Sequence, residues 1–433
     1  MCFTEFRPST VTGDQQYIKA STKYWATALY GGGGPVIVGR HDRPGRFDSS
    51  CSQTVQGHSG AVLDIEFNPF DDTIMATASE DTTIKLWQIP DDWEPTDKNG
   101  IGQKGEDLKT SMLDLEGHNK KVNLIRFHQS ANNILLSASA DHTVKVWDVE
   151  AGQEVSNLRN LPDLVQDIVW DYRGDNYATS NKDKSLRFVD ARTGNESAKV
   201  DKVHEGAKAV KICYLAESGK VLTTGASKQS GREMKVWDIK NLSKPLKVDK
   251  IDTASGAMIP LFDHDTLCLY LCGKGDGIIR IYEFEDKDPW IHKLNDGFRS
   301  TTPGKGYCMV PKRGLDIMQC ETVRLMKLTN NGAVHPLKFI VPRKSEAFQD
   351  DLFPDTASSS PAHSSGDWVG GSSKPPSMMS LDPKKNGGKG GSSAPASPRK
   401  SIKTVPMLNK EVAELKKRVE YLEGKLKSAN ISY

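Results

Sequence analysis

The sequence predicts an all-β fold, a β-propeller, and three observations point to it. Residues 57–87 and 117–148 share one pattern, in which Gly-His is followed by three short runs rich in β-branched residues, the last ending at a Trp. In both copies the His precedes the Trp by the same interval, because 87 − 58 = 147 − 118. Asp, Asn and Pro between the runs favour turns. A recurring unit of this kind is typical of four-stranded propeller blades.

The two repeats also predict a hydrogen-bonded network inside each blade. An indole can only donate and a neutral imidazole donates once and accepts once, so a buried His–Trp pair needs a hydroxyl and a carboxylate. We expect two such networks, formed by His58, Thr77, Asp81 and Trp87 and by His118, Ser137, Asp141 and Trp147. A Ser/His/Asp set also suggests a catalytic triad. Because the set recurs once per repeat, we assign it a structural role and predict no catalytic residue and no enzyme.

The repeat pattern weakens after residue 148 but continues along the chain. Further units are expected at residues 167–190, 204–238 and 267–283, with strand-like runs at 306–310 and 323–328. The last of these would close the ring against the N-terminal strand, which removes exposed sheet edges. Residues 19–25 are predicted to form one strand.

Composition excludes several classes of site. The seven cysteines of the 433-residue chain lack the spacing of disulfide frameworks or zinc sites. The glycine run at 31–34 is not followed by the Gly-Lys-Ser/Thr of a phosphate loop. The run at 273–277 is interpreted as a hairpin turn rather than a nucleotide site, because it places Asp-Gly between two β-rich runs. We therefore expect a reduced intracellular protein without metal or cofactor. No signal peptide and no apolar run long enough to form a transmembrane segment are predicted.

The charge is unevenly distributed. Residues 357–433 contain thirteen Lys or Arg and six Asp or Glu, a net +7, so the rest of the chain carries 2 − 7 = −5. Within this tail, residues 372–404 are rich in Ser, Pro, Gly and Lys and are predicted to be a disordered basic linker. The basic charge suggests an anionic partner or, alternatively, serves solubility. Nucleic acid is not expected, because aromatic residues do not interleave with the basic ones.

Residues 405–430 have the heptad spacing of a short α-helical coiled coil. The predicted oligomerisation residues are Val412, Leu415, Arg418, Val419, Leu422, Glu423 and Leu426. Val at a positions with Leu at d positions favours a dimer. Three heptads are marginal as an isolated helix, so a lone helix packing on the propeller remains the alternative to self-association.

Several further segments are distinctive, namely Leu222-Thr223-Thr224-Gly225, Leu271–Asp276, Pro311-Lys312-Arg313-Gly314-Leu315, Val341–Ser345, Phe348–Thr356 and Asp367–Gly371. In these segments the chain resembles the coronins, a family of actin-binding WD-repeat proteins. The resemblance covers nearly the whole chain apart from the linker. It implies a seven-bladed WD-repeat propeller at 1–342, of which patterning alone distinguishes about five blades. It also implies that residues 343–371 form an extension packed on the propeller.

The resemblance implies binding to filamentous actin, bundling or crosslinking of filaments, and regulation of actin dynamics and branched nucleation. The implied partners include the branched-actin nucleation complex and filament-severing factors, and the implied location is the cytoplasm, at the actin cytoskeleton and cell cortex. The family's N-terminal basic residue corresponds to Lys19, and Lys23 lies nearby. This chain departs from the family before Lys19, where the opening segment is reduced to Phe6-Arg7-Pro8.

The resemblance also bears on the oligomeric state. Arg418 and Glu423 fit a pattern that the family uses in short parallel trimers, so a homotrimer is favoured and a dimer remains possible. The alternative to an actin-binding function is that of a general WD-repeat scaffold or adaptor in trafficking or signalling that does not bind actin directly.

Overall fold

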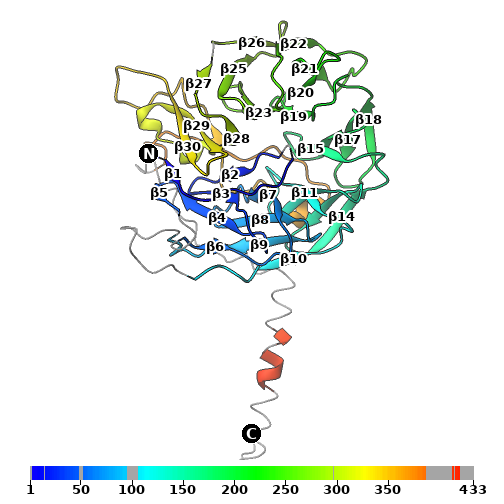
Figure 1. Ribbon diagram of the computed structural model, residues 1–433, viewed down its shortest axis with the longest axis vertical. Helices are drawn as coiled ribbons and strands as arrows, with labels where there is room; N and C mark the ends of the chain where they lie inside the picture. The colour runs from blue at the N-terminus through cyan, green and yellow to red at the C-terminus, as the bar shows by residue number, and fades with distance from the viewer. Residues whose placement is uncertain are drawn as a thin grey trace, which may run out of the picture.

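The computed structural model describes residues 2–13, 15–47, 52–94, 106–295, 297–386, 412–413 and 415–419. Seven β-sheets stand radially around one axis, so the protein is a seven-bladed propeller (Figure 1). The predicted all-β fold is therefore confirmed, and so is the number of blades that the family resemblance implied.

The strands of blades 1 to 4 are given from the axis outward. Blade 1 contains β2 (Ile18–Ala20), β3 (Tyr24–Ala28), β4 (Val36–Arg40) and β6 (Thr54–Val55). Blade 2 contains β7 (Val62–Phe67), β8 (Ile74–Ser79), β9 (Ile84–Gln88) and β10 (Leu113–Leu115). Blade 3 contains β11 (Val122–Phe127), β12 (Ile134–Ser139), β13 (Val144–Asp148) and β14 (Gln153–Leu158). Blade 4 contains β15 (Val165–Trp170), β16 (Asn176–Asn181), β17 (Leu186–Asp190) and β18 (Glu196–Val200).

Blades 5 to 7 complete the ring. Blade 5 contains β19 (Lys211–Tyr214), β20 (Lys220–Ala226), β21 (Arg232–Asp238) and β22 (Lys247–Asp252). Blade 6 contains β23 (Met258–Asp263), β24 (Cys268–Gly273), β25 (Ile278–Phe284) and β26 (Ile291–Lys293), and β27 (Phe298–Arg299) also pairs with β25. Blade 7 contains β28 (Gly304–Met309), β29 (Glu321–Thr329), β30 (Val334–Ile340), β1 (Phe3–Thr4) and β5 (Gly45–Arg46), with 3-10 turns η1 (Lys312–Gly314) and η2 (Ile317–Gln319) between β28 and β29.

The ring closes through the start of the chain. Phe3 of β1 pairs antiparallel with Val334 of β30 and parallel with Gly45 of β5. Because β1 thereby adds to the last blade, closure joins the two ends of the propeller and covers the outer side of β30. The sequence predicted closure of the last blade against the N-terminal strand at 19–25, but the strand that closes it is β1, nearer the start of the chain.

The single strand predicted at residues 19–25 is wrong. The chain forms β2 and β3 there, joined by a turn in which Ser21 Oγ accepts hydrogen bonds from the backbone N–H of Lys23 and Tyr24 at 3.3 and 3.1 Å. A Ser hydroxyl that bonds the backbone two or three residues on stabilises a turn. Lys19 and Lys23 therefore lie in different environments, one on a strand and one on a turn.

The hydrophobic core lies between neighbouring blades. Ile84 and Leu86 of blade 2, for example, pack against Val122, Ile125 and Trp147 of blade 3, and all five are buried. Each blade is covered on both faces by its two neighbours in the ring. Strands in the middle of a blade, such as β8 and β12, are therefore buried at every position. Burying one such side chain stabilises the fold by about 2 kcal/mol.

The disc has two faces, which the topology defines. Since successive strands run in opposite directions, the turns between second and third strands and the links between blades open on one face, named here the upper face. The turns between first and second and between third and fourth strands open on the other, the lower face. Figure 1 looks onto the upper face.

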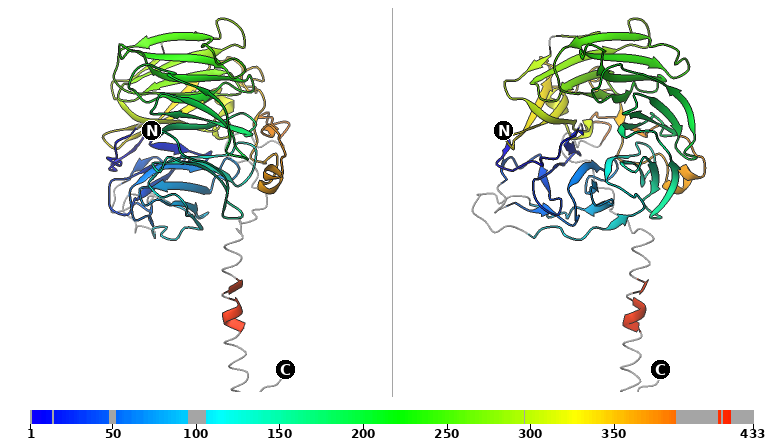
Figure 2. Two further views of the ribbon diagram at one scale, coloured as in Figure 1. Left: turned by 90° about the vertical axis from the view of Figure 1, so that its right-hand side faces the viewer. Right: turned by 45° about the vertical axis from the view of Figure 1, so that its right-hand side comes forward.

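Residues 343–386 form an arm along the lower face, seen in orange at one side of the disc in Figure 2. The arm contains β31 (Thr356–Ala357), α1 (Ser365–Val369) and β32 (Met378–Met379). It continues past residue 371, the boundary expected from the sequence: β32 pairs with β31, and Leu381 packs against Ile317 and Phe353. The remainder of the predicted linker, 387–404, lies outside the described residues.

Candidate binding surfaces and the networks that support them

The blade network predicted from the first repeat is present in blade 2. Trp87 Nε1 donates to Thr77 Oγ1 at 2.8 Å, and Thr77 Oγ1 lies 2.7 Å from His58 Nε2. His58 Nδ1 lies 2.8 Å from Asp81 Oδ2. Because the carboxylate can only accept, His58 donates from Nδ1 and accepts the Thr77 hydroxyl proton at Nε2. All four side chains are therefore satisfied.

Blade 3 repeats the same geometry with a Ser in place of the Thr. Trp147 Nε1 donates to Ser137 Oγ at 2.8 Å, Ser137 Oγ lies 2.8 Å from His118 Nε2, and His118 Nδ1 lies 3.0 Å from Asp141 Oδ2. Figure 1 shows the two blades side by side, with β7 and β11 nearest the axis. The two networks share the side-chain hydroxyl, whereas the methyl group of Thr77 has no counterpart in Ser137.

A third network in blade 5 was missed from the sequence. His204 Nε2 lies 3.0 Å from Thr223 Oγ1, which accepts from Trp237 Nε1 at 3.0 Å. The carboxylate on His204 Nδ1, at 2.9 Å, comes from Glu233 on strand β21. In blades 2 and 3 the carboxylate belongs to an Asp in the turn before the third strand. In blade 5 it belongs to a Glu on the third strand itself, so a pattern that requires the Asp does not detect this network. The spacing of His204 and Thr223, equal to that of His58 and Thr77, is the usable signal.

The charge states in blade 2 fit a structural role. Burial lowers the pKa of His58, so the ring is neutral. Burial opposes ionisation of Asp81, but hydrogen bonds from Thr83 and Ser59 and the neighbouring His58 ring outweigh it and lower the pKa to about 2. A neutral His58 bonded to an ionised Asp81 is consistent with a structural network, and their side chains are 1% and 8% exposed.

Lys19, the first predicted actin-binding residue, is buried rather than presented on the surface. Its side chain is 10% exposed and forms an ion pair with Glu66 of β7. Arg126 of β11 lies 3.8 Å from Glu66 and 2.7 Å from Asp64. It also lies 3.6 Å from Asp167 of β15. Lys19 thus belongs to a belt of alternating charges that links the innermost strands of blades 1 to 4, and its charge is compensated there.

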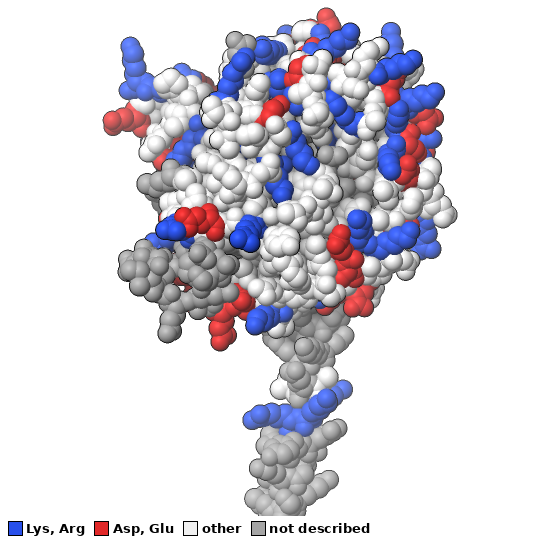
Figure 3. All heavy atoms as spheres, in the orientation of Figure 1, with Lys and Arg blue, Asp and Glu red and all other residues white. Residues whose placement is uncertain are grey.

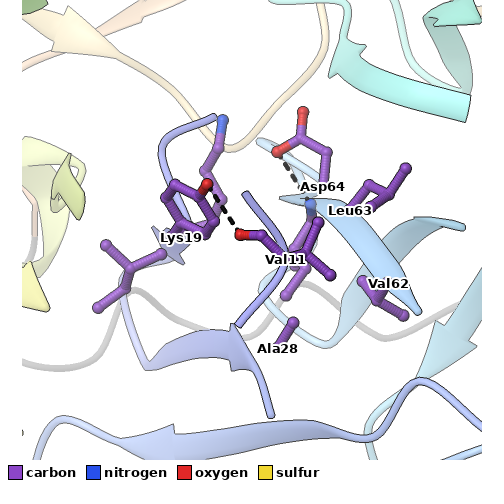
Figure 4. A pocket seen from close by; sticks show the side chains of 9 residues that line it. Val11, Lys19, Ala28, Val62, Leu63 and Asp64 are labelled. Carbon is purple, nitrogen blue, oxygen red and sulfur yellow. Dashed lines mark hydrogen bonds between the residues drawn. The ribbon is translucent and has the colours of Figure 1, made fainter. Parts of the chain in front are cut away.

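A small pocket adjoins the base of Lys19. Val11 of the N-terminal segment, Ala28 of β3 and Val62, Leu63 and Asp64 of β7 line it together with Lys19 (Figure 4). The Tyr17 hydroxyl donates to Gly13 O at 2.7 Å and lies 3.1 Å from Val11 O, which folds the N-terminal segment back over this position. The segment therefore contributes to the burial of Lys19.

Lys23, the second predicted residue, is exposed on the lower face. The turn that carries it is fixed from both sides. Asp72 of blade 2 accepts from Thr22 N at 2.8 Å and from Thr22 Oγ1 at 2.5 Å. His41 Nε2 donates to Ser21 O at 3.1 Å, and burial lowers the pKa of His41 to about 4, so its ring stays neutral. Lys23 is therefore an exposed cation on a rigid turn.

The arm is anchored by Trp368 of α1, whose side chain is fully buried. Trp170 and His128 pack edge-on against it at ring-centroid distances of 6.1 and 5.2 Å. The Arg192 guanidinium lies 4.7 Å from its ring, and Arg192 Nε donates to Trp368 O at 2.7 Å. A capping box between Ser364 and Asp367 starts the helix. Blades 3 and 4 supply this cage, and no sequence pattern joins it to residue 368.

Part of the predicted coil is described. Residues 412–413 and 415–419 are helical, and Val412, Leu415 and Val419 are 48%, 63% and 51% exposed. Arg418 is exposed as well. Leu422, Glu423 and Leu426 lie outside the described residues. The described helical residues thus present the apolar positions that a coiled coil would bury.

The described residues contain no group of three or more His, Cys, Asp or Glu side chains arranged to bind a metal ion. The six described cysteines are free thiols, and Cys272 is buried in its strand. Among the helices that the structure describes, none has the length and apolar character required to cross a membrane.

Comparison with known proteins identifies the family. Residues 49–88 and 109–148 match the WD domain, G-beta repeat, and residues 334–376 match a type of WD40 repeat. The crystal structure of the WD40 domain of Toxoplasma gondii coronin superposes with a TM-score of 0.81 at 32% sequence identity, over 88% of this chain and 95% of that domain. The chain belongs to the coronin family.

The curated relatives agree with this assignment. Human Coronin-2A is 36% identical over 363 residues, 82% of this chain. A coronin-like protein of Schizosaccharomyces pombe is 33% identical over 383 residues, 88% of this chain. The matched regions span 66% and 62% of the lengths of these two coronins.

Proposed function

We propose that this coronin binds actin filaments through its propeller and regulates filament organisation without catalysing a reaction. Membership of the coronin family carries the proposal. It is supported by the exposed cation of Lys23 on a fixed turn, because the actin filament surface is acidic and a positioned cation complements it. Arm contacts involve blades 3, 4, 6 and 7, at Glu150, Asp175, Asp265 and Ile317 respectively, whereas the Lys23 turn belongs to blade 1.

Lys19 supports this surface in a different way. Since its ammonium is paired with Glu66 inside the charge belt, a direct contact with the filament would cost that ion pair. We therefore assign Lys23 the direct contact and Lys19 the positioning of β2, the strand that leads into the Lys23 turn. This assignment reverses the order that the family match suggested.

The coil would make the protein multivalent. Self-association through Val412, Leu415 and Val419 links several propellers and raises the effective concentration of each at the filament. A trimer, favoured by the Arg418–Glu423 pattern, would bundle or crosslink filaments, and a dimer would do so with fewer contacts. The basic tail adds an electrostatic contact. The proposed location is the cytoplasmic actin cortex, where the branched-nucleation complex and severing factors are the proposed partners.

Co-sedimentation with filamentous actin over a salt series tests the proposal. The full chain is compared with Lys23→Glu, Lys19→Gln and a chain ending at residue 386. We expect Lys23→Glu to weaken binding about tenfold, because it replaces an attractive charge by a repulsive one. Truncation should weaken pelleting and abolish bundling seen at low centrifugal speed.

The control separates a direct contact from a folding defect. Lys19→Gln should lower thermal stability, since Glu66 loses its buried partner. It should reduce filament binding only to the extent that a smaller fraction of the variant is folded. If the folded wild-type chain does not pellet with filaments at low salt, actin is not its direct partner. A scaffold or adaptor role would then replace the present proposal.

A further inference from the structure

Three lysines on the upper face bridge neighbouring connections through backbone carbonyls. Lys184, in the turn between β16 and β17, donates to Glu205 O at 2.5 Å. Lys208, in the link between β18 and β19, donates to Ser230 O at 2.6 Å and to Ala254 O at 2.7 Å. Lys305 of β28 donates to Ser9 O of the N-terminal segment. We name these three side chains, Lys184, Lys208 and Lys305, the lysine arc.

The charges of the lysine arc are not neutralised by carboxylates. Within the described part of the chain, none of the three ammonium groups has an Asp or Glu oxygen within 4.0 Å. Three acids of the adjoining connections are engaged by arginines instead. Asp183 pairs with Arg187 at 3.3 Å, and Asp252 and Asp276 pair with Arg232 at 2.6 and 2.7 Å.

The surroundings are unfavourable to two of these cations, Lys208 and Lys305. Burial lowers the pKa of Lys208 and Arg232 lowers it further, and together they outweigh the opposing effect of Asp252. Burial lowers the pKa of Lys305, and the neighbouring Lys274 adds to the effect. A carbonyl satisfies one N–H but leaves the net charge in place. An anion placed above these lysines would remove a cost that the isolated propeller bears.

The positions of the lysines define the kind of anion. They belong to blades 4, 5 and 7, and each is tied to a different pair of connections, so the ammonium groups do not converge on one point. A phosphate or other compact anion needs converging donors. A broad acidic protein surface needs dispersed cations whose side chains are already ordered, which lowers the entropy cost of binding. Figure 3 looks onto this face and shows Lys and Arg atoms toward its centre, in the region of β23 and β28.

We infer that the lysine arc binds an acidic surface of the actin filament, which gives the propeller a contact surface on the face opposite Lys23. This inference rests on the proposed function and adds a second site to it. With cations on both faces, one propeller could contact two filaments before the coil contributes.

The test removes charge but preserves hydrogen bonds. In the full-length chain, Lys184→Gln, Lys208→Gln and Lys305→Gln are combined, since a Gln amide can still donate to a carbonyl. We expect filament binding about tenfold weaker, with a smaller dependence on salt. A second variant changes the charge in the opposite direction. Glu205→Gln removes an exposed negative charge and should tighten filament binding by about twofold. Lys199→Gln is the matched control, because Lys199 already pairs with Asp201 at 2.7 Å on the outer strand β18.

The outcomes distinguish the two proposals. If the triple variant is folded and binds filaments as wild type does, the lysine arc is not a filament contact. If Lys23→Glu has no effect while the triple variant is weakened, the lower-face contact fails and the arc stands. Loss of binding to phosphatidylserine vesicles with unchanged filament binding would make the ligand a lipid surface and overturn the inference. A wild-type chain that binds no filaments overturns both proposals.

Discussion

The blades and the arm are held in place by different means. Blade 2 carries its own support, because His58, Thr77, Asp81 and Trp87 all lie within one repeat and bond to one another. The arm has little support of its own: α1 is five residues long and depends on a cage that blades 3 and 4 supply around Trp368. The comparison teaches that a repeated unit specifies its own structure, whereas a docked segment depends on the surface that receives it.

Removing the arm's anchor should give the largest effect. Trp368→Ala removes a fully buried side chain and is expected to cost about 4 kcal/mol of docking free energy. Hydrogen exchange should then rise throughout residues 343–386 while the strands of the blades keep their protection, and limited proteolysis should cut the arm first. The neighbouring Val369, which is 43% exposed, is the control, since Val369→Ala should leave exchange unchanged. Loss of protection in the blades as well would show that arm and propeller unfold as one unit.

Breaking a network within a blade should have a slightly smaller effect, but on the whole propeller. Thr77→Val leaves the indole of Trp87 and the imidazole of His58 without their shared hydroxyl, at a cost of about 3 kcal/mol in the free energy of unfolding. Urea denaturation measures it. Thr77→Ser should cost less than about 1 kcal/mol, because Ser137 has the same role in blade 3. A larger loss in Thr77→Ser than in Thr77→Val would mean that packing of the methyl group, and not the hydroxyl, supports the blade.

Acidification should act on the junction between the two regions, with the smallest effect. His128 accepts from the backbone N–H of Ser130 and Ala131 at Nδ1 and donates from Nε2 to Gly174 O, and burial lowers its pKa to about 3. Between pH 6.5 and 3 the unfolded state binds the proton and the folded state does not, so stability falls as pH falls. The loss from His128 at pH 5.5 is about 1.4 kcal/mol.

Thermal unfolding at pH 7.5 and 5.5 measures this dependence. His128→Gln should be less stable at pH 7.5 but should lose less stability between the two pH values than wild type. In wild type the His128 imidazole contacts Trp368, so hydrogen exchange in the arm should rise at pH 5.5. An unchanged pH dependence in the variant would assign the loss to other buried histidines, such as His41.

The propeller was largely predictable because its signals are local and repeated. The spacing of His58 and Trp87 and the alternation of strand runs with turn residues lie within a single blade, and recurrence in blade 3 distinguishes them from chance. The Glu233 of blade 5 was not predictable in this way, because its carboxylate reaches His204 from a different strand. The single strand expected at 19–25 was wrong because the turn at residues 21–23 is no longer than β2, the strand before it, so the pattern runs through it.

The sequence by itself determined the blade repeats, the hydrogen-bonded networks of blades 2 and 3, the family and the heptad spacing of the coil, since each is carried by residues close together in the chain. Only the tertiary structure decided which lysine side chains are available to bind an acidic partner. Lys19 is paired with Glu66, 47 residues away, whereas the ammonium groups of the lysine arc donate to backbone carbonyls of other connections, and Lys305 also lies over the Tyr17 ring. Charge compensation depends on which side chains the closed ring brings within a few ångströms, and spacing along the chain does not encode that distance.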